Sequence, residues 1–185
     1  MVDLTKILKL SEDIAVQIIK GTFVGPILIA VSPAGLMSLS ILDPKMSRMD
    51  SEKKGASQAE EIADRAVDQI LDYSSGRLRA FTLPLDFSLA TNFQRKVLDV
   101  TAQIPFGEVL TYGGVAERIG KPKAARAVGG ALGRNPIGIV VPCHRVVAHN
   151  GHLHGFSSHT GIQMKAKLLR HEGVQLQDDS VPLER

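Results

Sequence analysis

Closely spaced capping residues, prolines and glycines divide the second half of the chain into short segments. Hydroxyl caps at Thr91 and Thr111 begin helices predicted over residues 91–102 and 112–119. A third helix is predicted over 123–132, after the turn Gly-Lys-Pro-Lys. Two short helices joined by such a turn have the spacing of a helix-turn-helix.

The first half carries longer periodic segments. Apolar residues at helical spacing predict a helix over 3–20, and apolar runs at 27–32 and 36–42 around a Pro-Ala-Gly turn predict a β-hairpin. Residues 57–73 form an amphipathic helix with a capping box at its start. Residues 81–85 are expected to be an extended connector, because Pro84 disfavours a central strand.

Three further segments follow the predicted helix-turn-helix. The apolar run 137–141 predicts a buried strand that leads into Pro142-Cys143, and Asn150-Gly151 predicts a hairpin turn. A last helix is predicted over 161–171, and we expect the tail 174–185 to be loosely held.

Length and composition fit an ordinary globular protein. The 185 residues suit one domain or two small ones, and 44% hydrophobic with 22% charged residues argues against disorder. Cys143 is the sole cysteine, which excludes the disulfide-rich secreted class and favours a reducing compartment. No signal peptide is visible, and no apolar run approaches the ~18 residues of a membrane span. We therefore expect a soluble, cytoplasmic protein without membrane contacts.

Positive charge is concentrated in one stretch of the second half. Residues 118–171 contain nine Lys or Arg and no Asp or Glu. A local basic field of this kind favours a polyanion such as nucleic acid, although a solvated basic face that binds nothing has the same composition.

The predicted helix 123–132 consists mostly of Ala and Gly. Two adjacent glycines in a helix cost about 1 kcal/mol each relative to alanine, so they call for a reason. One reason is close packing against a neighbouring helix. The other is a helix slim enough to enter a narrow groove, with Arg126 as the long side chain of its first turns.

Cys143 is the best candidate for chemistry, because a thiolate is a strong nucleophile and the cations of His144 and Arg145 beside it are expected to lower its pKa. Most lone cysteines are inert and buried, so this alternative stays open. Glu172 is the one acid between Glu117 and Asp178, and it could orient His144 as the third member of a triad. His149, His152, His154 and His159 match no standard metal spacing, so we expect no metal.

From Phe81 to Gly173 the chain closely resembles the O6-alkylguanine-DNA alkyltransferases, the methylated-DNA–protein-cysteine methyltransferases. The matching segments are LPLDFS, FQRKVL, IPFGEVLTYGGVA, PKAARAVGGALGRNP, IVVPCHRVV and LLRHEG, and GPILIAVSPAGL is similar to that family's first hairpin. The pentapeptide PCHRV after ARAVGGAL is highly specific.

The resemblance implies an α+β fold and a repair activity. Residues 1–88 would form a small ribonuclease-H-like α/β domain, 89–175 a winged helix-turn-helix domain, and 176–185 a tail. The protein would act as a monomer on double-stranded DNA, bind the minor groove, flip out O6-alkylguanine and transfer the alkyl group irreversibly to Cys143. It would need no cofactor and would react once.

The resemblance also assigns roles to single residues. Cys143 would accept the alkyl group, with His144 acting through a water as base and Glu172 orienting it. Arg126 would fill the gap left by the flipped base, and Tyr112 would push the adjacent phosphate and help to protonate the departing guanine. The other implied residues are Asn135 as the hinge between recognition helix and active-site loop, main-chain groups of Cys143 and Val146 reading the guanine edge, and Gln94, Gly113, Lys121 and His149 as DNA contacts.

The chain departs from the family in the wall of the alkyl pocket. Ser158 and His159 lie in the stretch 155–161, where the family commonly has Tyr-Ser-Gly-Gly, and Gly138 stands where some members have proline. Two other functions compete with repair: a base-flipping sensor that does not react, against which the presence of Cys143 argues, and a Cys-His hydrolase, which would leave the basic helix-turn-helix without a purpose.

Overall fold

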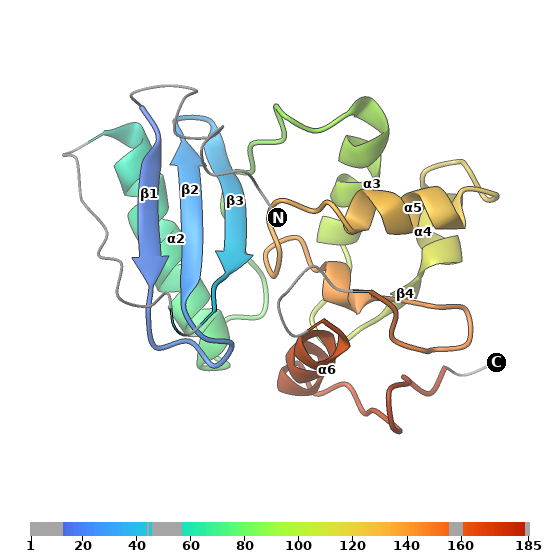
Figure 1. Ribbon diagram of the computed structural model, residues 1–185. Coiled ribbons are helices and arrows are strands. Elements are labelled where there is room, and N and C mark those ends of the chain that lie inside the picture. The colour runs from blue at the N-terminus through green and yellow to red at the C-terminus, as the bar shows by residue number, and fades with distance from the viewer. Residues whose placement is uncertain (1–12, 44, 46–56, 156–160, 184–185) are drawn as a thin grey trace. The chain divides into compact units, whose positions relative to one another are not determined.

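The computed structural model describes residues 13–43, 45, 57–155 and 161–183. The chain divides into two compact units, Met1–Leu89 and Ala90–Arg185, and each mixes helices with strands (Figure 1). Among the described helices, none combines the length and apolar composition needed to cross a membrane.

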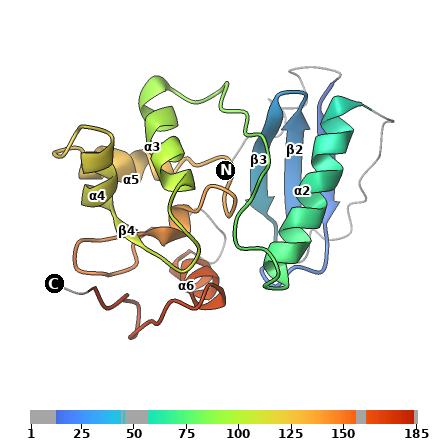
Figure 2. The ribbon, with the colours of Figure 1, turned by 180° about the vertical axis from the view of Figure 1, so that it is seen from behind.

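In its described residues, the first unit is a three-stranded antiparallel sheet covered by helix α2. Strands β1 (Ala15–Ile19), β2 (Ile27–Ser32) and β3 (Gly35–Ile41) lie in the order β1-β2-β3, and every residue of the central β2 is buried. Helix α2 (Gln58–Ser74) covers one face of the sheet (Figure 2). The predicted hairpin and amphipathic helix are both confirmed.

Local hydrogen bonds fix the ends of these elements. Ser57 Oγ accepts from the backbone N–H of Glu60 at 3.3 Å and so caps α2. After α2 the predicted extended connector returns beside β3, where Leu36 N–H donates to Pro84 O at 2.8 Å and Leu85 forms a parallel bridge with Leu36. The connector is therefore an edge of the sheet, the place where a proline is tolerated.

The helix predicted over 3–20 is wrong where the structure describes it, because Ala15–Ile19 is strand β1; residues 3–12 lie outside the described residues. Burial alternates along β1, and its register pairs Ala15 with Val31 and Ile19 with Ile27 of β2. The buried Gln17 amide donates to the carboxylates of Glu60 and Asp64 on α2. Pairing with a distant strand thus overrides the local spacing.

Where the structure describes it, the second unit packs short helices around the small strands β4 and β5. Helices α3 (Asn92–Ala102), α4 (Tyr112–Arg118) and α5 (Ala125–Leu132) pack pairwise, and α3 and α4 begin at their predicted caps, Thr91 and Thr111. Strand β4 (Leu110–Thr111) runs parallel to β5 (Val146–Val147), and helix α6 (Ile162–His171) follows (Figure 1).

Residues 137–141 are buried turns, so the predicted strand is wrong. Val141 N–H donates to Ile137 O at 2.9 Å and Val140 N–H to Gly138 O at 2.8 Å, which are turn contacts within the segment. Ile139 has φ +69°, a rare conformation for a β-branched residue, yet it is almost completely buried. Apolar composition here indicates burial rather than extended backbone.

The segment after α6 is packed, and a loosely held tail is the wrong description of residues 174–183. Leu153 N–H donates to Asp179 O at 2.9 Å, and Val181 N–H donates to Gly151 O at 3.0 Å, across the predicted Asn150-Gly151 turn. Val174 and Val181 complete a core cluster with the buried residues Val147, Leu153, Ala166 and Leu169.

The Gly151→Ala substitution tests this packing. A Cβ at Gly151 would collide with the carbonyl oxygen of Val181, and its φ of +80° already disfavours a side chain. We expect the free energy of unfolding to fall by more than about 2 kcal/mol. Gly120→Ala is the matched control, because its φ is +72° but nothing lies within 4 Å, so about 1 kcal/mol is expected. Urea denaturation followed by circular dichroism measures both; equal losses would contradict the packed tail.

Candidate functional site

Cys143 begins a short 3-10 helix, η2 (Cys143–Arg145), between the buried turns and β5. Its N–H donates to Val141 O at 2.8 Å, and the N–H of Val146 donates back to its carbonyl. The residue as a whole is partly exposed, although its thiol group lies in a buried environment. Successive side chains of an extended strand point to opposite faces. Cys143 and His144 lie in the helical turn η2 instead, so this restriction does not apply to them.

Asn135 connects the end of α5 to the cysteine loop. Its side-chain amide donates to Val141 O at 2.9 Å, and its carbonyl oxygen accepts from Ile137 N–H at 3.1 Å. The same side chain hydrogen-bonds the Cys143 thiol. Asn135 thus ties the segment that follows α5 to the loop that precedes Cys143.

A buried carboxylate holds the two residues that follow Cys143. Glu172, at the C-terminal end of α6, accepts from His144 Nε2 at 2.8 Å and from Arg145 Nε and Nη2 at 2.7 and 2.8 Å. The N–H of Gly107 also donates to it, at 3.3 Å. All three side chains are almost inaccessible to water. Burial alone would raise the pKa of Glu172, but the hydrogen bonds from His144 and Arg145 outweigh it and hold this pKa far below its usual range.

This arrangement leaves His144 neutral with one nitrogen unused. Burial lowers the pKa of His144, against the raising effect of Glu172. Because the ionised Glu172 can only accept, Nε2 carries the proton, and Nδ1 holds a free lone pair. Nδ1 is buried and has no hydrogen-bond partner in the described part of the chain. A buried, unpartnered nitrogen of this kind is equipped to take a proton.

The thiol of Cys143 is not ionised at rest, which corrects the expectation that nearby cations lower its pKa. Burial raises this pKa and outweighs the lowering by the Asn135 hydrogen bond and the Lys165 charge. A base must therefore remove the proton before the sulfur becomes a strong nucleophile.

Tyr112 lies against the loop that follows β5. Its hydroxyl donates to His154 O at 3.3 Å, and its ring is the nearest group to the position of a Cβ on Gly129 of α5, at 3.8 Å. Burial and the neighbouring Cys143 raise the pKa of Tyr112, so its phenol keeps its proton. A Cβ at Gly129 would make only ordinary van der Waals contact with this ring.

Lys165 is a residue of the site that sequence reasoning missed. It lies on α6, is completely buried, and its Nζ donates to Val146 O at 2.6 Å and to His154 O at 3.1 Å. The available signal was its helical spacing with Leu168, Leu169 and Glu172, which places a lysine on the inward stripe of α6.

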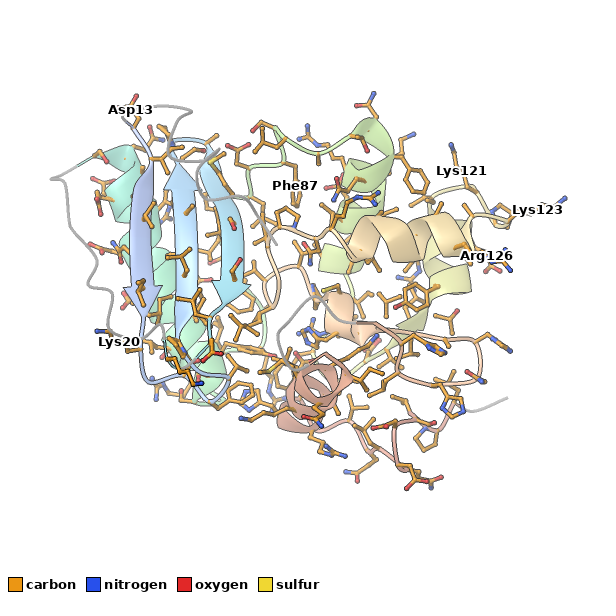
Figure 3. The ribbon with its side chains drawn as sticks, in the orientation of Figure 1. Asp13, Lys20, Phe87, Lys121, Lys123 and Arg126 are labelled. Carbon is orange, nitrogen blue, oxygen red and sulfur yellow. The ribbon has the colours of Figure 1, made fainter. Side chains whose placement is uncertain are left out.

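The predicted DNA contacts lie mainly on α3, α4 and α5. Arg126 and Lys121 are exposed and extend outward with Lys123 (Figure 3), and Lys121 Nζ lies 5.6 Å from the ring centroid of Phe93. Gln94 donates to the carbonyl of Ala131 in the last turn of α5 at 3.4 Å and to that of Arg134 just beyond the helix at 2.9 Å.

The remaining candidates are dispersed. Gly113 lies in the first turn of α4, and His149 is exposed at the turn before Gly151. Val146 is buried, and its carbonyl already accepts from Lys165. Ser158 and His159 lie outside the described residues. Among the described residues, no group of three or more His, Cys, Asp or Glu could hold a metal ion.

Comparisons with known proteins agree with this geometry. The family model of the 6-O-methylguanine DNA methyltransferase DNA-binding domain matches residues 92–174. A methylated-DNA–protein-cysteine methyltransferase of Methanosarcina acetivorans is 41% identical over 152 residues, which cover 81% of this chain and 93% of that protein.

Solved structures give the same result. The crystal structure of Mycobacterium tuberculosis O6-methylguanine methyltransferase has a TM-score of 0.71 and 35% identity, over 90% of this chain and 96% of that one. A crystal structure of Mycobacterium tuberculosis OGT in complex with DNA has a TM-score of 0.71 and 38% identity, over 85% and 91%. The fold and the Cys-His-Glu site thus define a protein of the methyltransferase class. The chain belongs to the methylated-DNA–protein-cysteine methyltransferase family.

The Glu172→Gln substitution is expected to destabilise the second unit by about 3 kcal/mol at pH 7, because a buried Arg145 would lose its carboxylate. The pKa of Glu172 is lower in the folded state than the unfolded value of about 4.3. The contribution of ionised Glu172 to the free energy of unfolding is therefore full above about pH 4.3. It is lost as the pH falls through the pKa that Glu172 has in the folded state. Urea titrations read by pulsed hydrogen exchange should show the two proteins converging in acid.

Asp72→Asn provides the control for this measurement. Asp72 pairs with Arg77 through side chains that are 44% and 68% exposed, so its loss should cost less than about 1 kcal/mol. An equally small effect at Glu172 would contradict the structural role assigned to the buried carboxylate.

Proposed function

We propose that this protein repairs DNA directly, by transferring the alkyl group of O6-alkylguanine to the sulfur of Cys143. Family membership supports this proposal, and so does the Mycobacterium tuberculosis relative that was crystallised with DNA. The observation that carries it is the free Nδ1 of His144, which is held by Glu172 beside a neutral thiol. A site with this base and nucleophile needs only a substrate brought within reach.

The reaction follows from the protonation states of the site. The Cys143 thiol gives its proton, through a water molecule, to His144 Nδ1, and ionised Glu172 stabilises the resulting imidazolium. The thiolate electron pair forms the sulfur–carbon bond, and the carbon–O6 pair stays on the guanine. The guanine takes one proton from the Tyr112 phenol, which regains it from the imidazolium through solvent. The product thioether is a poor leaving group, so each molecule reacts once.

DNA recognition is assigned to α4 and α5 as a winged helix-turn-helix. The Ala- and Gly-rich α5 is slim enough for a minor groove about 6 Å wide, where base readout is degenerate. Arg126 would fill the space of the flipped base, because extrusion costs a few kcal/mol. Gln94, Gly113, Lys121, His149 and the main chain of Val146 would supply further contacts. Binding should depend little on sequence and strongly on salt.

The finer description of the first unit belongs to the same proposal. We infer that its sheet and α2 are a reduced ribonuclease-H-like domain, and that the protein acts as a monomer without a cofactor. Within the described residues this unit carries neither cysteine nor histidine, so the chemistry is assigned to the second unit.

Intact mass spectrometry tests the reaction. After incubation with duplex DNA that contains O6-methylguanine, the protein should gain one methyl group per chain, and Cys143→Ala should gain none. Because Cys143 is the single cysteine, the modified residue is identified without peptide mapping. Transfer beyond one equivalent would contradict single use, and a tight lesion complex with unmodified protein would favour a non-reacting sensor.

The Arg126→Ala substitution tests base extrusion separately from chemistry. We expect transfer from duplex DNA to slow about tenfold or more, since about 1.4 kcal/mol of lost stabilisation has this effect. Transfer from the free base O6-benzylguanine should not change, because nothing needs to be extruded. Arg170→Ala removes an exposed positive charge from α6 as a control. Equal slowing on both substrates would contradict the role of Arg126.

A further inference from the structure

Lys165 is a completely buried lysine whose ammonium is fixed in place. Its Nζ donates to the carbonyls of Val146 and His154, at 2.6 and 3.1 Å, and lies 5.7 Å from the ring centroid of Tyr112. Val146 immediately follows η2, so the first of these bonds holds the ammonium next to the turn that carries Cys143. The reaction proposed above does not use this group.

A buried ammonium needs a counter-ion. Removing an unpaired charge from water costs several kcal/mol, and carbonyl dipoles offset this cost only in part. No carboxylate pairs with Lys165 in the described part of the chain, and Glu172 on the same helix is already shared between His144 and Arg145. The group near Lys165 that can become an anion at modest cost is the thiol of Cys143.

We propose that Lys165 is the counter-ion of the Cys143 thiolate: its ammonium, fixed by the carbonyls of Val146 and His154, stabilises the negative charge that the sulfur carries before alkyl transfer. This inference deepens the proposed function and rests on it. Lys165 keeps its proton throughout, and the thiol proton still goes to His144. Lys165 is thus a positioning residue, which acts through the charge of Cys143.

The electrostatics of the site are consistent with this pairing. Burial lowers the pKa of Lys165 to about 8, and Cys143 acts in the opposite direction. The charge of Lys165 in turn lowers the pKa of Cys143. Among the described residues, the titratable groups facing the ammonium are Cys143 and His144 from η2 and Tyr112 from α4. Alkylation converts the Cys143 thiol to a neutral thioether, which can no longer form the thiolate that pairs with Lys165.

The test measures thiol ionisation without DNA. Iodoacetamide reacts with the thiolate, and Cys143 is the single cysteine, so its rate as a function of pH gives the Cys143 pKa directly. We expect Lys165→Met to raise the midpoint by about one unit, which slows the reaction about tenfold at pH 7. Lys165→Arg should stay close to the wild type, and Lys167→Met, an exposed lysine on the same helix, should match it. If Lys165→Met lowered the maximal iodoacetamide rate at high pH but left the midpoint of the pH profile unchanged, the proposal would be overturned, because a merely structural role has this signature.

A second measurement needs no substitution at Lys165 and covers the case in which that variant fails to fold. The ε-carbon NMR signal of Lys165 is titrated in the wild-type protein before and after Cys143 is capped with iodoacetamide. We expect Lys165 to lose its proton at lower pH in the capped protein, because the neutral thioether cannot pair with it. An unchanged Lys165 titration would overturn the inference.

The two proposals fail in distinguishable ways. If the midpoint moves but no methyl group is transferred from DNA, the ion pair is established and the repair function is wrong. If methyl transfer occurs but neither titration moves, the repair function stands and Lys165 is not the counter-ion.

Discussion

The rest of the site depends on one buried carboxylate. Glu172 joins three separate parts of the second unit, since it accepts from His144 and Arg145 in η2 and from the N–H of Gly107 in the loop before β4. Water is excluded, so each of these hydrogen bonds is strong and the loss of any one leaves a polar group unpaired. The same contacts decide which nitrogen of His144 is protonated. The hydrogen bonds that Glu172 accepts therefore both hold these segments together and set the protonation of His144.

A sulfur that is neutral at rest suits a protein that reacts once. Thiolates react with many electrophiles, and any such reaction would consume the nucleophile of Cys143 before it met a lesion. In this site burial raises the pKa of the thiol. In the proposed reaction His144 accepts the thiol proton and Lys165 balances the charge of the thiolate. Reactivity then depends on the substrate completing the site rather than on a permanently charged sulfur.

The parts of the fold that follow from local chemistry were predictable from the sequence. The caps at Thr91 and Thr111 set the starts of α3 and α4. The motif around Cys143 also predicted the nucleophile of the proposed reaction. Strand β1 and the turns at 137–141 were not predictable, because apolar periodicity cannot show a distant pairing partner or the left-handed backbone of Ile139. Lys165 was missed for a related reason: no local window shows which carbonyls a lysine will contact.

The packing of residues 174–183 has a consequence for biosynthesis. Val174 and Val181 complete the cluster that contains Val147 and Leu153, and the N–H of Leu153 finds its acceptor at Asp179. On the ribosome, the nascent cysteine loop therefore lacks its supporting layer until these late residues have emerged. The first unit contains its own sheet and helix, and it is synthesised earlier. Synthesis from the N-terminus thus orders the assembly of the two units, with the reactive one maturing last.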